Sequence, residues 1–193
     1  GQIGEIWISG ATVTRGYWGQ ADATRESFQA TLAQTPTGEP RREYLRTGDL
    51  GFLWRGHLYI TGRLKDLIIV RGGNHYPSDI ERTAGESHPG LGAGSSAAFG
   101  VEIDDEEHVV IVQEVQREHL RTFQHVEVCQ AMRQAIVDDH LVPLHAILLV
   151  RPGSVPKTTS GKIQRGEARR MYLAGEFKTV ASWEAGDQPS EAM

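Results

Sequence analysis

The stretch "TGRLKDLIIVRGGNHYPSDIE", residues 61–81, divides the sequence into two parts of different character. Within it, "LIIV" (67–70) is an unbroken apolar run, which is typical of a strand buried on both faces. The "SDIE" that closes it (78–81) matches the capping box that opens many helices. We therefore expect a boundary near residues 62–66, followed by a compact α/β unit over residues 67–178.

The part before this stretch, residues 1–62, is predicted to be rich in strands. Polar and apolar residues alternate in "GEIWIS" (4–9), as in a half-buried strand, and "VTRGYW" (13–18) is expected to form a second short strand. A helix is expected from Ala23 to Leu32. "DLGFL" and "HLYIT" are expected to form a β-hairpin with Gly56 at its turn.

The part after the stretch begins with a predicted loop, "GGNHYP" (72–77), and a helix that ends near Ser87. "SSAAFGVEI" and "HVVIVQEV" are expected to be two neighbouring strands joined at the acidic run 104–107. We interpret that run as a solvated turn rather than a metal site. These elements predict a mixed α/β (α+β) fold for the second part.

Six apolar side chains recur at intervals of three and four residues and predict an amphipathic helix. They are Leu120, Phe123, Val126, Cys129, Met132 and Ile136. Cys129 lies on the apolar stripe, so we expect a buried thiol rather than a nucleophile. "HAILLV" (145–150) is a further buried strand, a short Arg-rich helix is expected over 164–174, and a polar tail over 179–193.

The composition excludes several classes of protein. The longest apolar run, "AILLV" (146–150), is far shorter than the roughly 20 residues that a membrane span needs. A formal net charge of −5 over 193 residues does not favour a nucleic-acid partner. The single cysteine excludes an internal disulfide and fits a reducing, cytoplasmic location. It also leaves no Cys₂His₂ zinc site, and we expect no metal ligand in this chain. Because the sequence enters a strand pattern almost at once, without an initiator Met, we expect it to be a piece of a larger protein.

"VPKTTSGKIQR" (155–165) places Lys162 after a glycine in a loop rich in Thr and Ser. A P-loop is excluded, because Pro156 stands where its first glycine would be and Ile163 where its Ser or Thr would be. We expect a flexible loop that holds a primary ammonium toward anionic oxygens. Over residues 151–170 six bases and one acid leave a local charge of +5, which favours either a small anion or acidic partner, or a solvated helix face.

Asp49 and Arg63 lie at neighbouring ends of the predicted hairpin. Asp49 follows a glycine in "YLRTGDLG" (44–51), where its carboxylate could accept from two vicinal hydroxyls. A carboxylate beside a guanidinium is suited to a ribose. The same two residues could equally form a salt bridge that closes the hairpin.

Four stretches in this order and spacing resemble the motifs of adenylate-forming enzymes: the acyl-CoA synthetases, luciferases and non-ribosomal adenylation domains. They are "GEIWISGATVTRGYW", "YLRTGDLG", "TGRLKDLIIVRGGNHYPSDIE" and "PKTTSGK". With "AAFGVEI" and "VVIVQEV", the third stretch is similar to the fatty acyl-AMP ligase branch. One departure is Gly73, where that branch has an arginine.

The resemblance implies a role for each matching residue. Lys162 would be catalytic, reaching the carboxylate and the α-phosphate during adenylation, and Asp49 and Arg63 would bind the nucleotide. Lys65 would be the hinge within a linker at 63–66, between the end of the large domain (1–62) and a mobile subdomain (67–178). A loop of Gly72, Gly73 and Asn74 would approach the site when the thiol acceptor binds.

The resemblance also implies the reaction and its participants. A fatty acid and ATP, with Mg²⁺, would give an acyl-adenylate, and the acyl group would pass to the phosphopantetheine thiol of a holo-acyl carrier protein. The Mg²⁺ ligands and the fatty-acid pocket would lie in an upstream adenylation-domain segment, so this fragment alone is expected to be inactive. Two alternatives stay open: an acyl- or aryl-CoA ligase with CoA as acceptor, and a non-catalytic module that docks a carrier protein.

Overall fold

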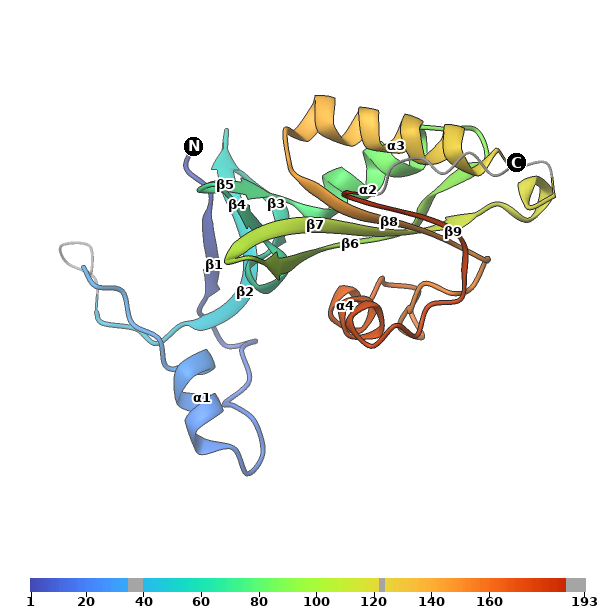
Figure 1. The fold of residues 1–193 in the computed structure, drawn as a ribbon. Helices are drawn as coiled ribbons and strands as arrows, with labels where there is room; N and C mark the ends of the chain where they lie inside the picture. Colours follow the sequence, from blue (N-terminus) through green and yellow to red (C-terminus); the bar gives the residue numbers. More distant parts are fainter. Residues whose placement is uncertain (35–39, 122–123, 187–193) are drawn as a thin grey trace. The chain divides into compact units, whose positions relative to one another are not determined.

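The computed structural model describes residues 1–34, 40–121 and 124–186, and its described part has a mixed α/β fold. The chain divides into two compact units, Gly1–Lys65 and Asp66–Met193. Figure 1 labels the helices and strands of both units. The division falls inside the stretch where the sequence changes character.

The first unit is built on a three-stranded antiparallel sheet in the order β1-β2-β3. Its strands are β1 (Gly4–Ile8), β2 (Leu45–Trp54) and β3 (His57–Arg63), and its α-helix is α1 (Ala21–Phe28). Arg55 and Gly56 both have positive φ, 48° and 79°, and join β2 to β3. Such a two-residue turn matches the twist of the strands, and the hairpin predicted around Gly56 is confirmed.

Two predictions for the first unit were wrong. Residues 13–18 form no strand, and α1 begins at Ala21 and ends at Phe28 instead of running from Ala23 to Leu32. Tyr17 instead packs edge-on against Phe28 of α1, with 5.1 Å between ring centroids. Tyr17 therefore contacts α1, and residues 13–18 do not pair in the sheet.

The second unit contains a four-stranded sheet in the order β6-β7-β8-β9 and a separate small hairpin, β4-β5. Strands β7 and β8 are parallel, with α3 between them in sequence, and the other neighbours are antiparallel. The elements, including the 3₁₀ helix η1 at the unit boundary, are η1 (Leu64–Asp66), β4 (Ile68–Val70), β5 (Gly73–His75), α2 (Pro77–Glu86), β6 (Leu91–Ile103), β7 (Glu106–Val115), η2 (Arg117–His119), α3 (His125–His140), β8 (Leu144–Val150), α4 (Arg165–Leu173) and β9 (Thr179–Glu184).

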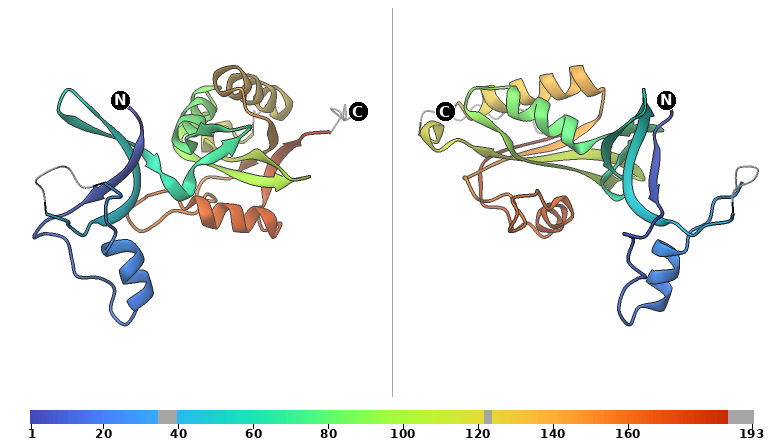
Figure 2. Two further views of the ribbon diagram at one scale, coloured as in Figure 1. Left: turned by 90° about the vertical axis from the view of Figure 1, so that its left-hand side faces the viewer. Right: turned by 180° about the vertical axis from the view of Figure 1, so that it is seen from behind.

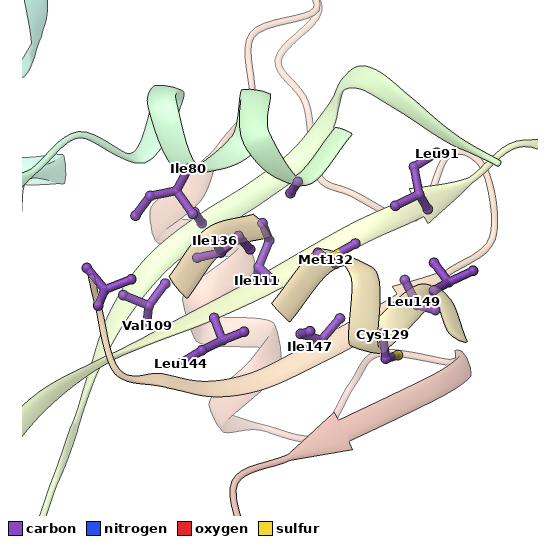
Figure 3. Close-up of a cluster of buried hydrophobic side chains, with 14 of the residues drawn as sticks. Ile80, Leu91, Val109, Ile111, Cys129, Met132, Ile136, Leu144, Ile147 and Leu149 are labelled. Carbon is purple, nitrogen blue, oxygen red and sulfur yellow. The ribbon is translucent and has the colours of Figure 1, made fainter. Parts of the chain in front are cut away.

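Helices cover both faces of this sheet, α2 and α3 on one side and α4 on the other (Figures 1 and 2). Successive residues of β7 and β8 therefore contribute alternately to two cores. Figure 3 shows the core under α2 and α3, where Ile111 and Ile147 of the sheet meet Met132 and Ile136 of α3. Burial on both faces explains why these strands are continuous apolar runs in the sequence.

Several boundaries in the second unit differ from the predictions. Residues 73–75, expected in a loop, form β5, because Arg71 and Gly72, at φ 48° and 77°, make a two-residue turn that returns the chain along β4. Helix α3 begins at His125 rather than near Leu120, and Phe123 lies outside the described residues. Residues 179–184, expected in a polar tail, form β9 against β8, while 187–193 lie outside the described residues.

No helix in the described part of the chain is long and apolar enough to cross a membrane.

Cys129 is 5% exposed on the apolar face of α3, as predicted, and burial raises the pKa of its thiol to about 11. The thiol therefore stays protonated at pH 8, and a thiol-specific reagent such as dithionitrobenzoate should label it roughly 100-fold more slowly in the native protein than in guanidinium. Following the absorbance of the released thiolate checks this. Equal labelling rates in the two conditions would contradict the placement of Cys129.

Candidate functional site

Lys162 lies in a tight loop between β8 and α4. The Thr158 amide donates to the Lys162 carbonyl at 2.8 Å, the Gly161 amide to the Thr158 carbonyl at 2.9 Å, and the Lys162 amide to Thr158 Oγ1 at 3.0 Å. Gly161 has φ 81°, a conformation that favours glycine. We expected a flexible loop, and the structure instead shows one closed by its own hydrogen bonds. The Lys162 side chain is exposed, and no ion pair to it is found among the described residues.

Buried carboxylates hold both ends of this loop. At its start, the amide of Val155 donates to Glu114 Oε1 at 2.9 Å. At its end, Arg165 binds both carboxylate oxygens of Glu81, each at 2.7 Å, and Asp66 at 3.2 Å. Hydrogen bonds from Arg165 to Glu81 outweigh burial and raise the pKa of the arginine. The base of the loop is thus fixed while the tip presents Lys162.

Several of the basic side chains of residues 151–170 have partners in the structure, which the sequence does not show. Arg165 is occupied as described, and Arg170 pairs with Glu167 at 2.8 Å and with Glu176 at 2.7 Å. Arg169 donates to the carbonyl of Gly100 at 3.0 Å. Arg165 and Arg170 are thus paired with carboxylates, while Arg169 keeps its charge beside a neutral carbonyl, so fewer of the six bases are unpaired than the sequence suggested.

Asp49 and Arg63 are brought together in the first unit. They are direct partners in the register of β2 and β3, and Arg63 Nε donates to Asp49 Oδ1 at 2.9 Å. The salt bridge that the sequence suggested is therefore present. Both side chains stay partly exposed, 33% for Asp49 and 54% for Arg63. Such a pair still offers the second carboxylate oxygen to an incoming hydroxyl.

An open cavity of 460 Å³ in the first unit lies beside this pair. It is lined by Glu5, Tyr17, Glu26, Ser27, Arg46, Thr47, Gly48, Arg63, Leu64 and Lys65. Sequence analysis missed Glu5, which accepts from Trp7 Nε1 at 2.9 Å, Arg46 Nε at 3.0 Å and the Gly48 amide at 3.2 Å. Burial works to raise the pKa of Glu5, but these hydrogen bonds together lower it. The sequence around Glu5 shows only the polar–apolar alternation of a strand. That alternation does not indicate that Glu5 accepts three hydrogen bonds beside the cavity.

The predicted hinge residue and the predicted thiol-acceptor loop lie at the boundary between the two units and just after it. Lys65 is exposed in η1 and is the last residue of the first unit. Gly72 occupies the β4-β5 turn, and Gly73 and Asn74 follow in β5. The amide of Ile69, in β4, donates to Glu107 Oε2 in β7 at 2.9 Å, which ties this hairpin to the main sheet.

The described residues contain no group of three or more His, Cys, Asp or Glu side chains that could hold a metal ion. In the acidic run 104–107, Asp104 and Asp105 form the turn between β6 and β7, with φ 51° and 61°. The described residues therefore do not fit Mg²⁺.

Comparison with known proteins agrees with this architecture. A model of the family "Disco-interacting protein 2-like, AMP domain" matches residues 65–182. The medium-chain-fatty-acid–[acyl-carrier-protein] ligase JamA of Moorena producens is 46% identical over 184 residues, covering 95% of this chain and 30% of JamA. The probable long-chain-fatty-acid–AMP ligase FadD30 of Mycobacterium tuberculosis is 44% identical over 189 residues, covering 95% of this chain and 32% of FadD30.

A solved structure from a study of fatty acyl-adenylate ligases of E. coli and L. pneumophila superimposes with a TM-score of 0.67 at 35% identity, covering 90% of this chain and 28% of that one. The chain thus spans about a third of the length of the relatives that it matches. The family match covers more than half of the chain and includes both the β4-β5 hairpin and the Lys162 loop. The chain therefore belongs to the Disco-interacting protein 2-like AMP-domain family, in the fatty acyl-AMP ligase branch of the adenylate-forming superfamily, and is a partial chain of that fold.

Proposed function

We propose that this chain is the C-terminal part of a fatty acyl-AMP ligase that passes its acyl group to an acyl carrier protein. The observation that carries the proposal is the Lys162 loop, which is fastened at both ends by buried carboxylates and presents an ammonium to solvent. A cation held in this way can stabilise negative charge that develops on oxygens during a reaction. The names of JamA and FadD30 support the substrate class.

In the first half-reaction, a carboxylate oxygen of the fatty acid attacks the α-phosphorus of ATP, and pyrophosphate leaves with the electrons of the broken P–O bond. Lys162 binds the carboxylate and α-phosphate oxygens and stabilises the charge on them. Asp49 accepts from the ribose hydroxyls, and Arg63 orients the Asp49 carboxylate through the 2.9 Å hydrogen bond between them.

In the second half-reaction, the thiol of phosphopantetheine attacks the acyl carbon, loses its proton, and AMP leaves. Lys162 and the β4-β5 hairpin with Gly72, Gly73 and Asn74 lie in the same unit, so a rotation at Lys65 would exchange one for the other. The fatty-acid pocket and the Mg²⁺ ligands belong to the upstream segment, so we expect this chain by itself to be inactive.

The test uses the full-length protein that contains this chain. With ATP, Mg²⁺ and dodecanoate it should form dodecanoyl-adenylate, detected by mass spectrometry, and the acyl group should move to holo-acyl carrier protein but not to CoA. Efficient transfer to CoA would instead make it an acyl-CoA ligase. Absence of adenylate with every carboxylate tried would reduce the chain to a module that binds carrier proteins.

A further inference from the structure

Arg165 joins three segments of the second unit that are far apart in the sequence. Its Nε and Nη2 atoms donate to the two carboxylate oxygens of Glu81 in α2, each at 2.7 Å, and its Nη1 donates to Asp66 Oδ2 at 3.2 Å. The partners are 84 and 99 residues away in the sequence. We call this group the Arg165 clamp: Arg165, Glu81 and Asp66.

The clamp is largely shielded from water. The exposed side-chain fractions are 23% for Arg165, 11% for Glu81 and 19% for Asp66. Glu81 Oε1 also accepts from the amide of Ala98 in β6 at 3.0 Å, so the carboxylate is anchored to the sheet. A bidentate arginine–carboxylate pair fixes the direction of both groups as well as their distance.

The position of the clamp links it to the chemistry. Arg165 begins α4 and follows Lys162 by three residues. Asp66 comes directly after Lys65, where the first unit ends. A single side chain therefore ties the base of the Lys162 loop to the first residue of the second unit.

We propose that Arg165 is a positioning residue that acts through Lys162. By holding the loop against α2 and Asp66, it makes the Lys162 ammonium move as a rigid part of the second unit when the chain rotates at Lys65. This inference rests on the proposed function, in which Lys162 serves adenylation and not acyl transfer. The clamp should therefore matter to the first half-reaction and not to the second.

Arg170 provides a matched control in the same helix. It also makes two carboxylate pairs, but its partners Glu167 and Glu176 are three and six residues away, and its side chain is 53% exposed. Within the described residues, Arg170 thus joins no distant segments. Arg170→Lys therefore makes the same exchange in the same helix without touching the contacts that hold the Lys162 loop.

The experiment measures both half-reactions of the full-length protein in Arg165→Lys and Arg170→Lys variants. Adenylation is followed by pyrophosphate exchange, and transfer is started from synthetic dodecanoyl-adenylate and holo-acyl carrier protein. Lysine keeps the charge of Arg165 but cannot reproduce the planar, two-oxygen pair with Glu81. We expect the kcat of adenylation to fall roughly 10- to 100-fold with the KM for ATP unchanged. Transfer by Arg165→Lys, and both reactions of Arg170→Lys, should stay within about twofold of the parent.

A double variant tests whether Arg165 acts through Lys162. Once Lys162→Ala has removed the ammonium, adding Arg165→Lys should cause no further loss of adenylation. Losses that multiply, or an equal fall of both half-reactions in Arg165→Lys, would overturn the positioning role.

A second variant guards against misfolding of the first. Glu81→Gln combined with Arg165→Gln removes both charges of the bidentate pair, so that only Asp66, which is 19% exposed, loses an ionic partner, and the glutamine oxygen at 81 can still accept from Ala98. We expect this pair to fold, as judged by circular dichroism, and to lose adenylation selectively, because Asp66 is no longer held. If Lys162→Ala abolishes adenylation but the folded Glu81→Gln/Arg165→Gln variant does not reduce it, the positioning role of Arg165 is wrong and the proposed function still holds. If Lys162→Ala itself has no effect, the proposed function fails.

Discussion

Replacing Lys162 by alanine should lower the adenylation rate of the full-length protein by roughly 100- to 1000-fold, the usual cost of removing one charge-stabilising contact. In the proposed function the Lys162 ammonium stabilises the negative charge on the reacting oxygens. The loop backbone is closed by hydrogen bonds from Thr158 and Gly161 that the substitution leaves in place. Pyrophosphate exchange measures the loss, and transfer from synthetic acyl-adenylate should change little.

The fold should survive this substitution. Lys162 is exposed, so the free energy of unfolding should change by less than about 0.5 kcal/mol, measured by urea unfolding. Lys157→Ala is the control, because it removes a lysine from the same loop whose ammonium lies 4.0 Å from Glu114. It should leave adenylation within a few-fold of the parent. Full activity of Lys162→Ala would show that this lysine has no catalytic part.

Replacing Lys65 by proline should separate the two half-reactions. Proline fixes φ near −65°, so a rotation that this residue absorbs would stop at one end. We expect one half-reaction to fall at least about tenfold more than the other, because in the proposed function each half-reaction needs its own orientation of the second unit. Pyrophosphate exchange and transfer from synthetic adenylate, measured on the same preparation, give the ratio.

Lys65→Ala keeps the freedom of φ and removes only the side chain. Both half-reactions of this control should stay close to those of the parent. An equal loss of both reactions in Lys65→Pro would mean that the boundary residue serves stability and is not a hinge.

Features that depend on neighbours in the sequence could be predicted. The hairpin at Gly56 follows from a local demand for positive φ, which glycine meets without strain. The buried strand β8 follows from an apolar run, and the burial of Cys129 from the period of α3. The Lys162 loop was recognised as unusual for the same reason, because its glycine and small polar residues are adjacent.

Features that depend on distant pairing could not be predicted. Glu81 matched a capping box, but α2 begins with Pro77 at its first turn and has no side-chain cap, and the carboxylate binds Arg165 instead. The residues next to Glu81 and those next to Arg165 in the sequence do not indicate that the two side chains pair. In the same way, β5 is too short and too rich in glycine to suggest a strand until Ile68–Val70 lies beside it.

The last strand of the sheet has a practical consequence for how this unit can be handled. Strand β9 pairs along β8 from Ala146 to Val150, and those β8 residues are all buried. A chain ending at residue 178 would leave one side of β8 with unsatisfied amides and carbonyls beside an apolar surface, which invites strand exchange between molecules. The six residues of β9 thus cover this edge of the buried strand β8, and a shortened chain that keeps the edge covered should reach at least Glu184.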